Sequence, residues 1–89
     1  MPEVITQTLP CPAPLLGFMI GRNGHAIKAM QATSGATFYI NDSDRVADFN
    51  IEYVYMRLRG TPQQVDRAKR LVMLRMYNLT QGHDAAAQA

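Results

Sequence analysis

The segment Ile20-Gly21-Arg22-Asn23-Gly24 decides how this chain folds, because it joins an apolar stretch before it to a helical stretch after it. Glycine adopts positive φ angles readily and lets another chain approach closely, since it has no Cβ atom. A helix that begins after Gly24 directs its free N–H groups and the positive end of its dipole back over this turn. Helix termini of this kind bind anions. The sequence therefore predicts a loop that holds an anionic partner.

Length and composition limit the chain to one small domain. Its 89 residues, 47% of them hydrophobic, suffice for a single core. The net charge of +2 is too small for a protein that binds duplexes by charge alone, so a polyanion has to be held locally. Cys11 is the single cysteine, which excludes an internal disulfide and a cysteine-rich zinc site. The longest apolar run, residues 15–20, is too short to span a membrane, and a cytoplasmic or nuclear location is expected.

Hydrophobic periodicity and turn residues predict six regular elements. The clearest alternation lies at residues 51–59, where Val54, Met56 and Leu58 fall on one side of a strand. The expected order is a strand at 4–9, helices at 14–20 and 25–34, strands at 36–41 and 51–59, and a last helix from 62 to about 79 or 80. These elements make one domain over residues 4–80, and the tail at 81–89 is expected to be disordered.

Prolines, glycine and polar residues mark the expected boundaries. Pro10, Pro12 and Pro14 disfavour regular pairing and predict an extended connector after the first strand. Gly35 follows the second helix, as a C-terminal glycine should. The polar run at residues 41–44 is expected to end the second strand.

The last helix has an N-terminal signature and an amphipathic pattern. Thr61 is expected as its N-cap, with Pro62 in the first turn and Gln64 closing a capping box. One side carries the residues expected in the core: Val65, Ala68, Val72, Met76 and Leu79. The other side carries charged residues expected to face outward: Asp66, Arg67, Lys69, Arg70 and Arg75.

Two stretches around the glycine turn resemble the K-homology (KH) domain. They are Gly17-Phe18-Met19-Ile20-Gly21-Arg22-Asn23-Gly24-His25-Ala26-Ile27-Lys28-Ala29-Met30-Gln31 and Ser34-Gly35-Ala36-Thr37-Phe38-Tyr39-Ile40, with the family's GxxG signature in the first. A GxxG loop near the N-terminus, with a helix closing the chain, is the type I arrangement. The resemblance implies an α+β fold of order βααββα, a three-stranded antiparallel sheet packed on three helices.

The same resemblance implies binding of single-stranded RNA, about four nucleotides, by the GxxG loop and an adjacent apolar groove. The domain would then be one module of a larger RNA-regulatory protein. The residues that match the family's binding positions are Gly17, Phe18, Ile20, Gly21, Arg22, Asn23, Gly24, His25, Ile27, Lys28, Phe38 and Ile40. The apolar members form a floor for bases or belong to the ordinary core, and Ile20, Ile27 and Ile40 are expected to do both.

Four polar residues around the loop have separate expected roles. Arg22 is expected to face a backbone phosphate through its charge, and Asn23 through hydrogen bonding. Lys28, one helical turn later, either adds a second positive charge or lies on a solvated face. His25 in the first turn either contacts a phosphate or is a solvated side chain.

Other residues leave alternatives to RNA binding open. Tyr53, Tyr55, Arg57 and Arg59 form a strand face that extends the RNA contact, binds a partner or is merely exposed. KH domains pair through the last helix and the first strand, so Leu71, Met73, Leu74 and Tyr77 also fit a homodimer or a protein-interaction scaffold. Single-stranded DNA is a further candidate, because a phosphate clamp and an apolar floor do not demand a 2′-OH.

Catalytic and metal-dependent functions find no support in the sequence. It contains no paired acid and base, no Ser/His/Asp set and neither of the common nucleotide-binding glycine motifs. Asp42, Asp44 and Asp48 lack the glycine and glutamate that a calcium-binding EF-hand loop requires, so a solvated loop is expected there. The chain is expected to be no enzyme and to need neither cofactor nor metal.

Overall fold

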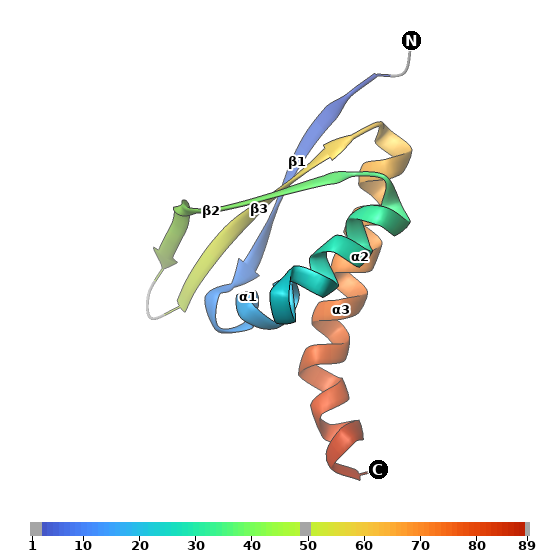
Figure 1. Ribbon diagram of the computed structural model, residues 1–89. Helices are drawn as coiled ribbons and strands as arrows, with labels where there is room; N and C mark the ends of the chain where they lie inside the picture. The colour runs from blue at the N-terminus through green and yellow to red at the C-terminus, as the bar shows by residue number, and fades with distance from the viewer. Residues whose placement is uncertain (1–2, 49–50, 89) are drawn as a thin grey trace.

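Three antiparallel strands form one sheet in the spatial order β1-β3-β2, and three α-helices pack against it (Figure 1). The computed structural model describes residues 3–48 and 51–88. The elements in chain order are β1 (Ile5–Pro12), α1 (Ala13–Ile20), the 3₁₀ turn η1 (Arg22–Gly24), α2 (His25–Ser34), β2 (Thr37–Asp48), β3 (Ile51–Gly60) and α3 (Pro62–Gln88). This βααββα order confirms the predicted α+β fold. No helix among these residues is both long enough and apolar enough to cross a membrane.

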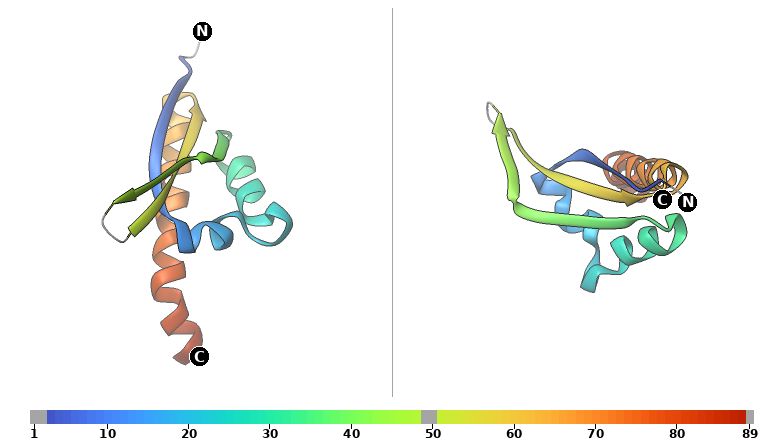
Figure 2. Two further views of the ribbon diagram at one scale, coloured as in Figure 1. Left: turned by 90° about the vertical axis from the view of Figure 1, so that its left-hand side faces the viewer. Right: turned by 90° about the horizontal axis from the view of Figure 1, so that it is seen from above.

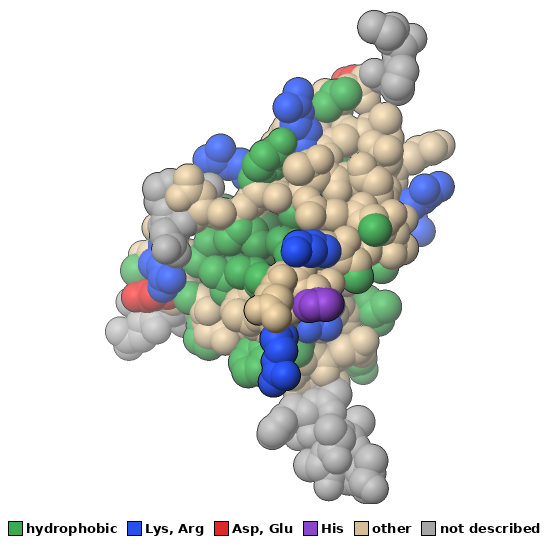
Figure 3. Space-filling view, viewed as in Figure 1, with side chains coloured by type: hydrophobic (Ala, Val, Ile, Leu, Met, Phe, Trp, Pro, Cys, Tyr) green, Lys and Arg blue, Asp and Glu red, His purple; other side chains and the backbone are tan. Residues whose placement is uncertain are grey.

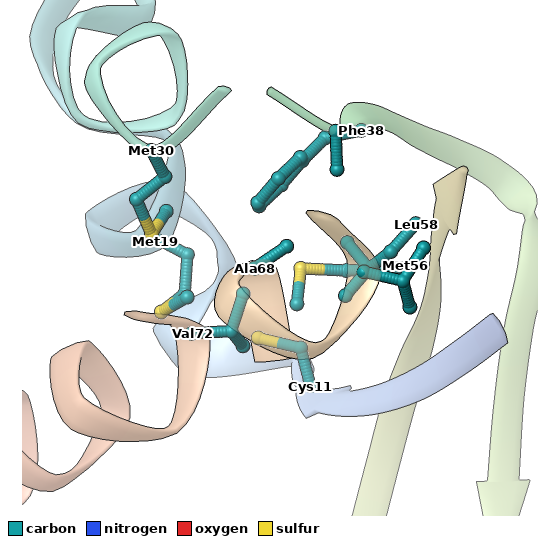
Figure 4. Close-up of a cluster of buried hydrophobic side chains, with 10 residues drawn as sticks. Cys11, Met19, Met30, Phe38, Met56, Leu58, Ala68 and Val72 are labelled. Carbon is teal, nitrogen blue, oxygen red and sulfur yellow. The ribbon is translucent and has the colours of Figure 1, made fainter. Parts of the chain in front are cut away.

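The hydrophobic core lies between the sheet and the helices (Figure 4). The central strand β3 alternates as predicted, with Val54, Met56 and Leu58 no more than 1% exposed. α3 contributes the predicted stripe, in which Val65, Ala68 and Val72 are buried and Met76 and Leu79 are partly buried at the margin. Because α1 and α2 also supply buried methionines to this core, the segment that carries the glycine turn is anchored to the sheet.

β1 continues through two prolines that were expected to end it. Pro10 pairs with Tyr55 of β3, and Pro12 pairs with Tyr53. Alternate residues of an antiparallel strand direct their N–H groups to the same edge, so both missing donors lie on one side. β1 is an edge strand and has one side without a partner, where proline is tolerated. The expected unpaired connector from residue 10 is therefore wrong.

β2 also runs further than the sequence analysis predicted. Pairing with β3 is interrupted between Ile40 and Arg45, where residues 41–44 stand opposite Tyr55 alone, and then resumes to Asp48. A bulge of this kind inserts extra residues into one strand without ending it. The polar run thus marks an irregularity in the ladder, and the predicted strand end was wrong. The side chains of Asp42, Asp44 and Asp48 lie outside the described residues.

α2 begins and ends where the sequence predicted. Gly35 adopts the left-handed conformation at φ 79° and ψ −3°, and its N–H donates to the carbonyl oxygen of Gln31 at 2.8 Å. The buried hydroxyl of Ser34 donates to the Met30 carbonyl at 2.7 Å and accepts from the N–H of Ala36 at 3.1 Å. These bonds satisfy the helix end as the chain turns into β2.

α3 starts with the predicted capping box and ends later than predicted. The Thr61 hydroxyl accepts from the Gln64 N–H at 3.2 Å, and the Gln64 side-chain oxygen accepts from the Thr61 N–H at 2.9 Å. The helix continues to Gln88, past the expected end near Thr80. Alanines in residues 85–87 favour a helix, and the propensity cost of Gly82 is only about 1 kcal/mol.

Candidate nucleic-acid interface

The glycine turn between α1 and α2 has an unusual backbone that only some residues can adopt. Gly21 has φ 79° and ψ 171°, while Asn23 and Gly24 lie in the left-handed region at φ 55° and φ 75°. Asparagine is enriched in this region among residues with a side chain. The Gly21 N–H donates to the Gly17 carbonyl at 2.9 Å, and the Gly24 N–H donates to the Gly21 carbonyl at 3.1 Å. The turn is therefore held by hydrogen bonds of its own backbone.

Close packing requires a glycine at residue 21, as its positive φ angle also does. A Cβ atom at this position would lie 2.8 Å from both the Cβ and the backbone nitrogen of Ala26. The start of α2 thus packs directly against the start of the turn. Any side chain at residue 21 would push the two apart and move the first N–H groups of α2.

Positive charge gathers on the turn and the first turns of α2. Arg22, Asn23, His25 and Lys28 are all exposed. The Lys28 side chain lies alongside the turn, with its Cε 3.7 Å from the place where a Gly24 Cβ would be. Figure 2 shows the turn at the periphery of the molecule, away from β2 and β3. Any anion at this corner would meet the Arg22 and Lys28 charges together with the N-terminal end of a helix.

An apolar surface adjoins the charged corner. Ile20, Ile27 and Ile40 are half-buried, and Ile27 and Ile40 pack against the core. Phe18 is 61% exposed, and a Cβ built at Gly17 would have nothing within 4 Å. Figure 3 shows a hydrophobic area between β2 and α1, with Lys or Arg and His side chains at the side where η1 and α2 lie. The structure therefore brings the predicted apolar and charged residues onto one face.

Phe38 is the exception among the residues expected to line this face. It is only 8% exposed and points into the core with Met30 and Leu58 (Figure 4). Its backbone N–H donates to the side-chain oxygen of Gln31 at 2.9 Å, which ties β2 to α2. Phe38 lies on the same side of β2 as Ile40, and because it is buried it supports the apolar surface from below.

Arg75 is a part of this region that the sequence analysis missed. It was expected to face outward as one of several charged residues of α3. In the structure its Nε donates to the backbone carbonyl of Phe18 at 3.0 Å, and its Nη2 donates to the same oxygen. Phe18 and Arg75 are 57 residues apart in the chain, so no local pattern could reveal this contact.

The described residues offer no metal site: no three His, Cys, Asp or Glu side chains among them are placed to hold an ion. Cys11 is 0% exposed in the core, and this burial raises the pKa of its thiol. The face around the loop therefore consists of charge, hydrogen-bonding groups and apolar surface.

Comparison with known proteins agrees with this geometry. The family model for the KH domain matches residues 6–74, which include the turn and its flanking helices. Among solved structures, the chain is similar to the first KH type I domain of human vigilin, with a TM-score of 0.68 and 19% sequence identity. That match covers 89% of this chain and 78% of the vigilin chain, and it shows the type I KH fold. The protein therefore belongs to the KH domain family, whose members are nucleic-acid-binding modules rather than enzymes.

Proposed function

We propose that this domain binds single-stranded RNA, about four nucleotides at a time, with its backbone against the GxxG loop and its bases on the adjoining apolar face. In this proposal the loop residues are Gly21, Arg22, Asn23 and Gly24. Lys28 adds a second charge, and Phe18, Ile20, Ile27 and Ile40 meet the bases. The domain acts as one module of a larger RNA-regulatory protein.

The observation that carries the proposal is the shape of the loop beside the apolar face. Positive φ angles at Gly21, Asn23 and Gly24 turn the chain so that the Arg22 and Asn23 side chains lie exposed above the start of α2. In the part of the chain that the structure describes, neither side chain makes a hydrogen bond or an ion pair. Both are thus available to a phosphate, which fixes the backbone while the bases contact the apolar surface.

The test replaces Arg22 and Asn23 together by aspartate. Two carboxylates would turn attraction into repulsion at close range, so RNA binding should fall below detection in a fluorescence titration. The fold should survive, because both glycines remain and acidic groups near the start of α2 suit its dipole. The melting temperature of the variant checks this point.

A matched control makes the same change in charge elsewhere. Arg67→Asp with Gln63→Glu also removes one positive and adds two negative charges, at exposed positions on α3. This control should keep most of its RNA binding. A folded loop variant that still binds RNA like the unaltered protein would refute the loop mechanism. Titration with DNA of the same sequence decides whether the 2′-OH contributes.

A second candidate, a protein-interaction or dimerisation scaffold, rests on a separate observation. Met73, Leu74 and Tyr77 on α3 are 58%, 56% and 63% exposed, which is high for large apolar side chains. Exposed apolar patches often mark contacts with another protein. The measurement that separates this candidate from RNA binding is the molecular mass in solution, together with the variant described in the Discussion.

A further inference from the structure

The sheet has a second face, on the side opposite to the core, that carries aromatic and basic side chains. Val54, Met56 and Leu58 point inward, so the alternate residues of β3, Tyr55, Arg57 and Arg59, point outward and are exposed. The strand register places neighbours beside them: Thr6 and Thr37 beside Arg59, Thr8 and Tyr39 beside Arg57, and Pro10 beside Tyr55. Tyr39 is 47% exposed and Tyr55 is 37% exposed.

This outer face is hollowed at two places. One hollow of about 640 Å³ is lined by residues that include Thr6, Tyr39, Asn41, Arg57 and Arg59. A second, of about 270 Å³, is lined by Pro10, Val46, Tyr53 and Tyr55. The basic end and the aromatic end of the face thus both have room for a ligand group.

The charged side chains that the structure describes on the outer face are basic. Among the acidic side chains that the structure describes, Glu52 pairs with Arg45 at 2.8 Å and Asp66 pairs with Arg70 of α3 at 3.1 Å. Glu52 lies two residues before Val54 and so on the inward side of β3, and Glu3 precedes β1. Arg57 and Arg59 thus place two exposed guanidinium groups on this face. A partner that suits it is anionic and presents flat groups to tyrosine rings.

β2 joins the outer face to the apolar face beside the GxxG loop. It is an edge strand, and its consecutive residues Tyr39 and Ile40 point to opposite sides of the sheet. Ile40 belongs to the apolar face, while Tyr39 pairs across the ladder with Arg57 on the outer face. A ligand that covers Ile40 has only one strand to cross before it meets Tyr39.

We propose that a single-stranded nucleic acid longer than the loop site continues over β2 onto this outer face. Its phosphates lie at Arg57 and Arg59, and its bases stack on Tyr39 and Tyr55. Aromatic rings bind unpaired bases by stacking, and arginine adds charge and planar contacts to the strand. The inference rests on the proposed function, because the strand is first held at the GxxG loop. The affinity of the domain then depends on the length of the strand as well as on its sequence at the loop.

The experiment compares a tetranucleotide with a strand of roughly ten nucleotides in three proteins. These are the unaltered domain, the variant Arg57→Gln with Arg59→Gln, and a control, Arg67→Gln with Arg70→Gln, that loses the same charge from α3. The outer-face variant should bind the tetranucleotide normally and bind the longer strand about tenfold more weakly. A longer strand also offers more registers, but this advantage is equal in all three proteins.

Salt dependence gives a second readout for the same strands. The slope of log K against log salt should be steeper for the longer strand by roughly 0.7 for each added phosphate contact, and this difference should vanish in the outer-face variant. Tyr39→Thr, which keeps a strand-forming residue, should weaken binding of the longer strand without changing the slope. Circular dichroism checks that each variant is folded.

Three other results would contradict either the outer-face proposal or the loop proposal, and the measurements tell the two apart. If the longer strand loses no more affinity in the outer-face variant than in the α3 control, the outer face does not bind nucleic acid. If light scattering shows a dimer that the outer-face variant dissociates, with no effect of strand length, the face binds protein and this inference is wrong. If the tetranucleotide fails to bind but the longer strand binds through Arg57 and Arg59, the loop proposal fails and the outer face stands.

Discussion

The guanidinium of Arg75 on α3 donates to the backbone carbonyl of Phe18 in the last turn of α1, with an Nε–O distance of 3.0 Å. Carbonyls in the last turn of a helix lack a partner within the helix, and this one is satisfied by a residue from the far end of the domain. The end of α1 leads directly into Gly21. Arg75 thus ties the approach to the GxxG loop onto the longest helix.

Replacing Arg75 by methionine removes these donors while keeping the apolar stem. We expect the free energy of unfolding to fall by about 1 kcal/mol and RNA binding to weaken severalfold, because the loop is then less well anchored. Chemical denaturation and a binding titration measure the two effects. Arg67→Met, on an exposed part of α3, is the control for the lost charge. Equal RNA affinity in the two variants would show that Arg75 does not position the loop.

A side chain at residue 17 should raise the stability of the domain and lower its affinity for RNA. It lies in α1, and a side chain there would meet nothing within 4 Å. Gly17→Ala should therefore stabilise the domain by about 0.5–1 kcal/mol, because alanine suits a helix better than glycine. RNA affinity should nevertheless fall, and fall further in Gly17→Leu, since the strand has to approach the helix backbone. Ala32→Leu on exposed α2 surface is the control, and unchanged affinity in both Gly17 variants would place the RNA elsewhere.

The exposed apolar residues of α3 allow a direct test of the scaffold alternative. Leu74→Glu with Tyr77→Lys leaves the net charge unchanged and adds an opposite-charge pair along the helix. The variant should stay folded, because Leu74 and Tyr77 are 56% and 63% exposed while the core stripe is untouched. Leu71 is left in place, since it packs against the core. Light scattering should show a dimer becoming a monomer if these residues pair two copies, and a monomer beforehand excludes that idea.

Because of Cys11, the free energy of unfolding should change with pH in the alkaline range. Burial raises the pKa of its thiol, whereas in the unfolded chain the thiol titrates near its ordinary value of about 8.5. Above that pH the unfolded chain loses the proton first, so stability present at neutral pH is lost as pH rises toward the native pKa. The free energy of unfolding should fall between pH 8 and 10 more steeply, by up to about 1.4 kcal/mol per pH unit, than in Cys11→Ala. Parallel slopes would mean that the thiol ionises equally in both states.

The features that could be predicted from sequence are those set by neighbouring residues. The bounds of α2, the glycine that follows it and the capping box of Thr61 and Gln64 all depend on side chains within four positions of one another. The alternation of β3 was equally readable, because one of its faces is buried and the other is exposed. Hydrophobic periodicity and turn residues also predicted the order of the remaining elements, and the family motif implied which residues form the loop.

The features that were missed depend on position within the sheet or on distant partners. Pro10 reads as a strand terminator until β1 is known to be an edge strand. The polar run before Arg45 reads as a loop until pairing with Val54 shows that the ladder resumes. Phe38 has the period of a strand, but only the packing of α2 and α3 shows that it is buried. The hydrogen bond from Arg75 to Phe18 can be predicted only once the whole fold is known, because the two residues are 57 positions apart.

The two prolines of β1 have a consequence for how copies of the domain behave when crowded. An open strand edge with all its N–H and C=O groups is a template for pairing with a strand from another molecule. The outward edge of β1 lacks the donors of Pro10 and Pro12, so an added strand would leave its own carbonyls unpaired there. Copies that meet at high concentration therefore cannot pair continuously along residues 10–12 of β1.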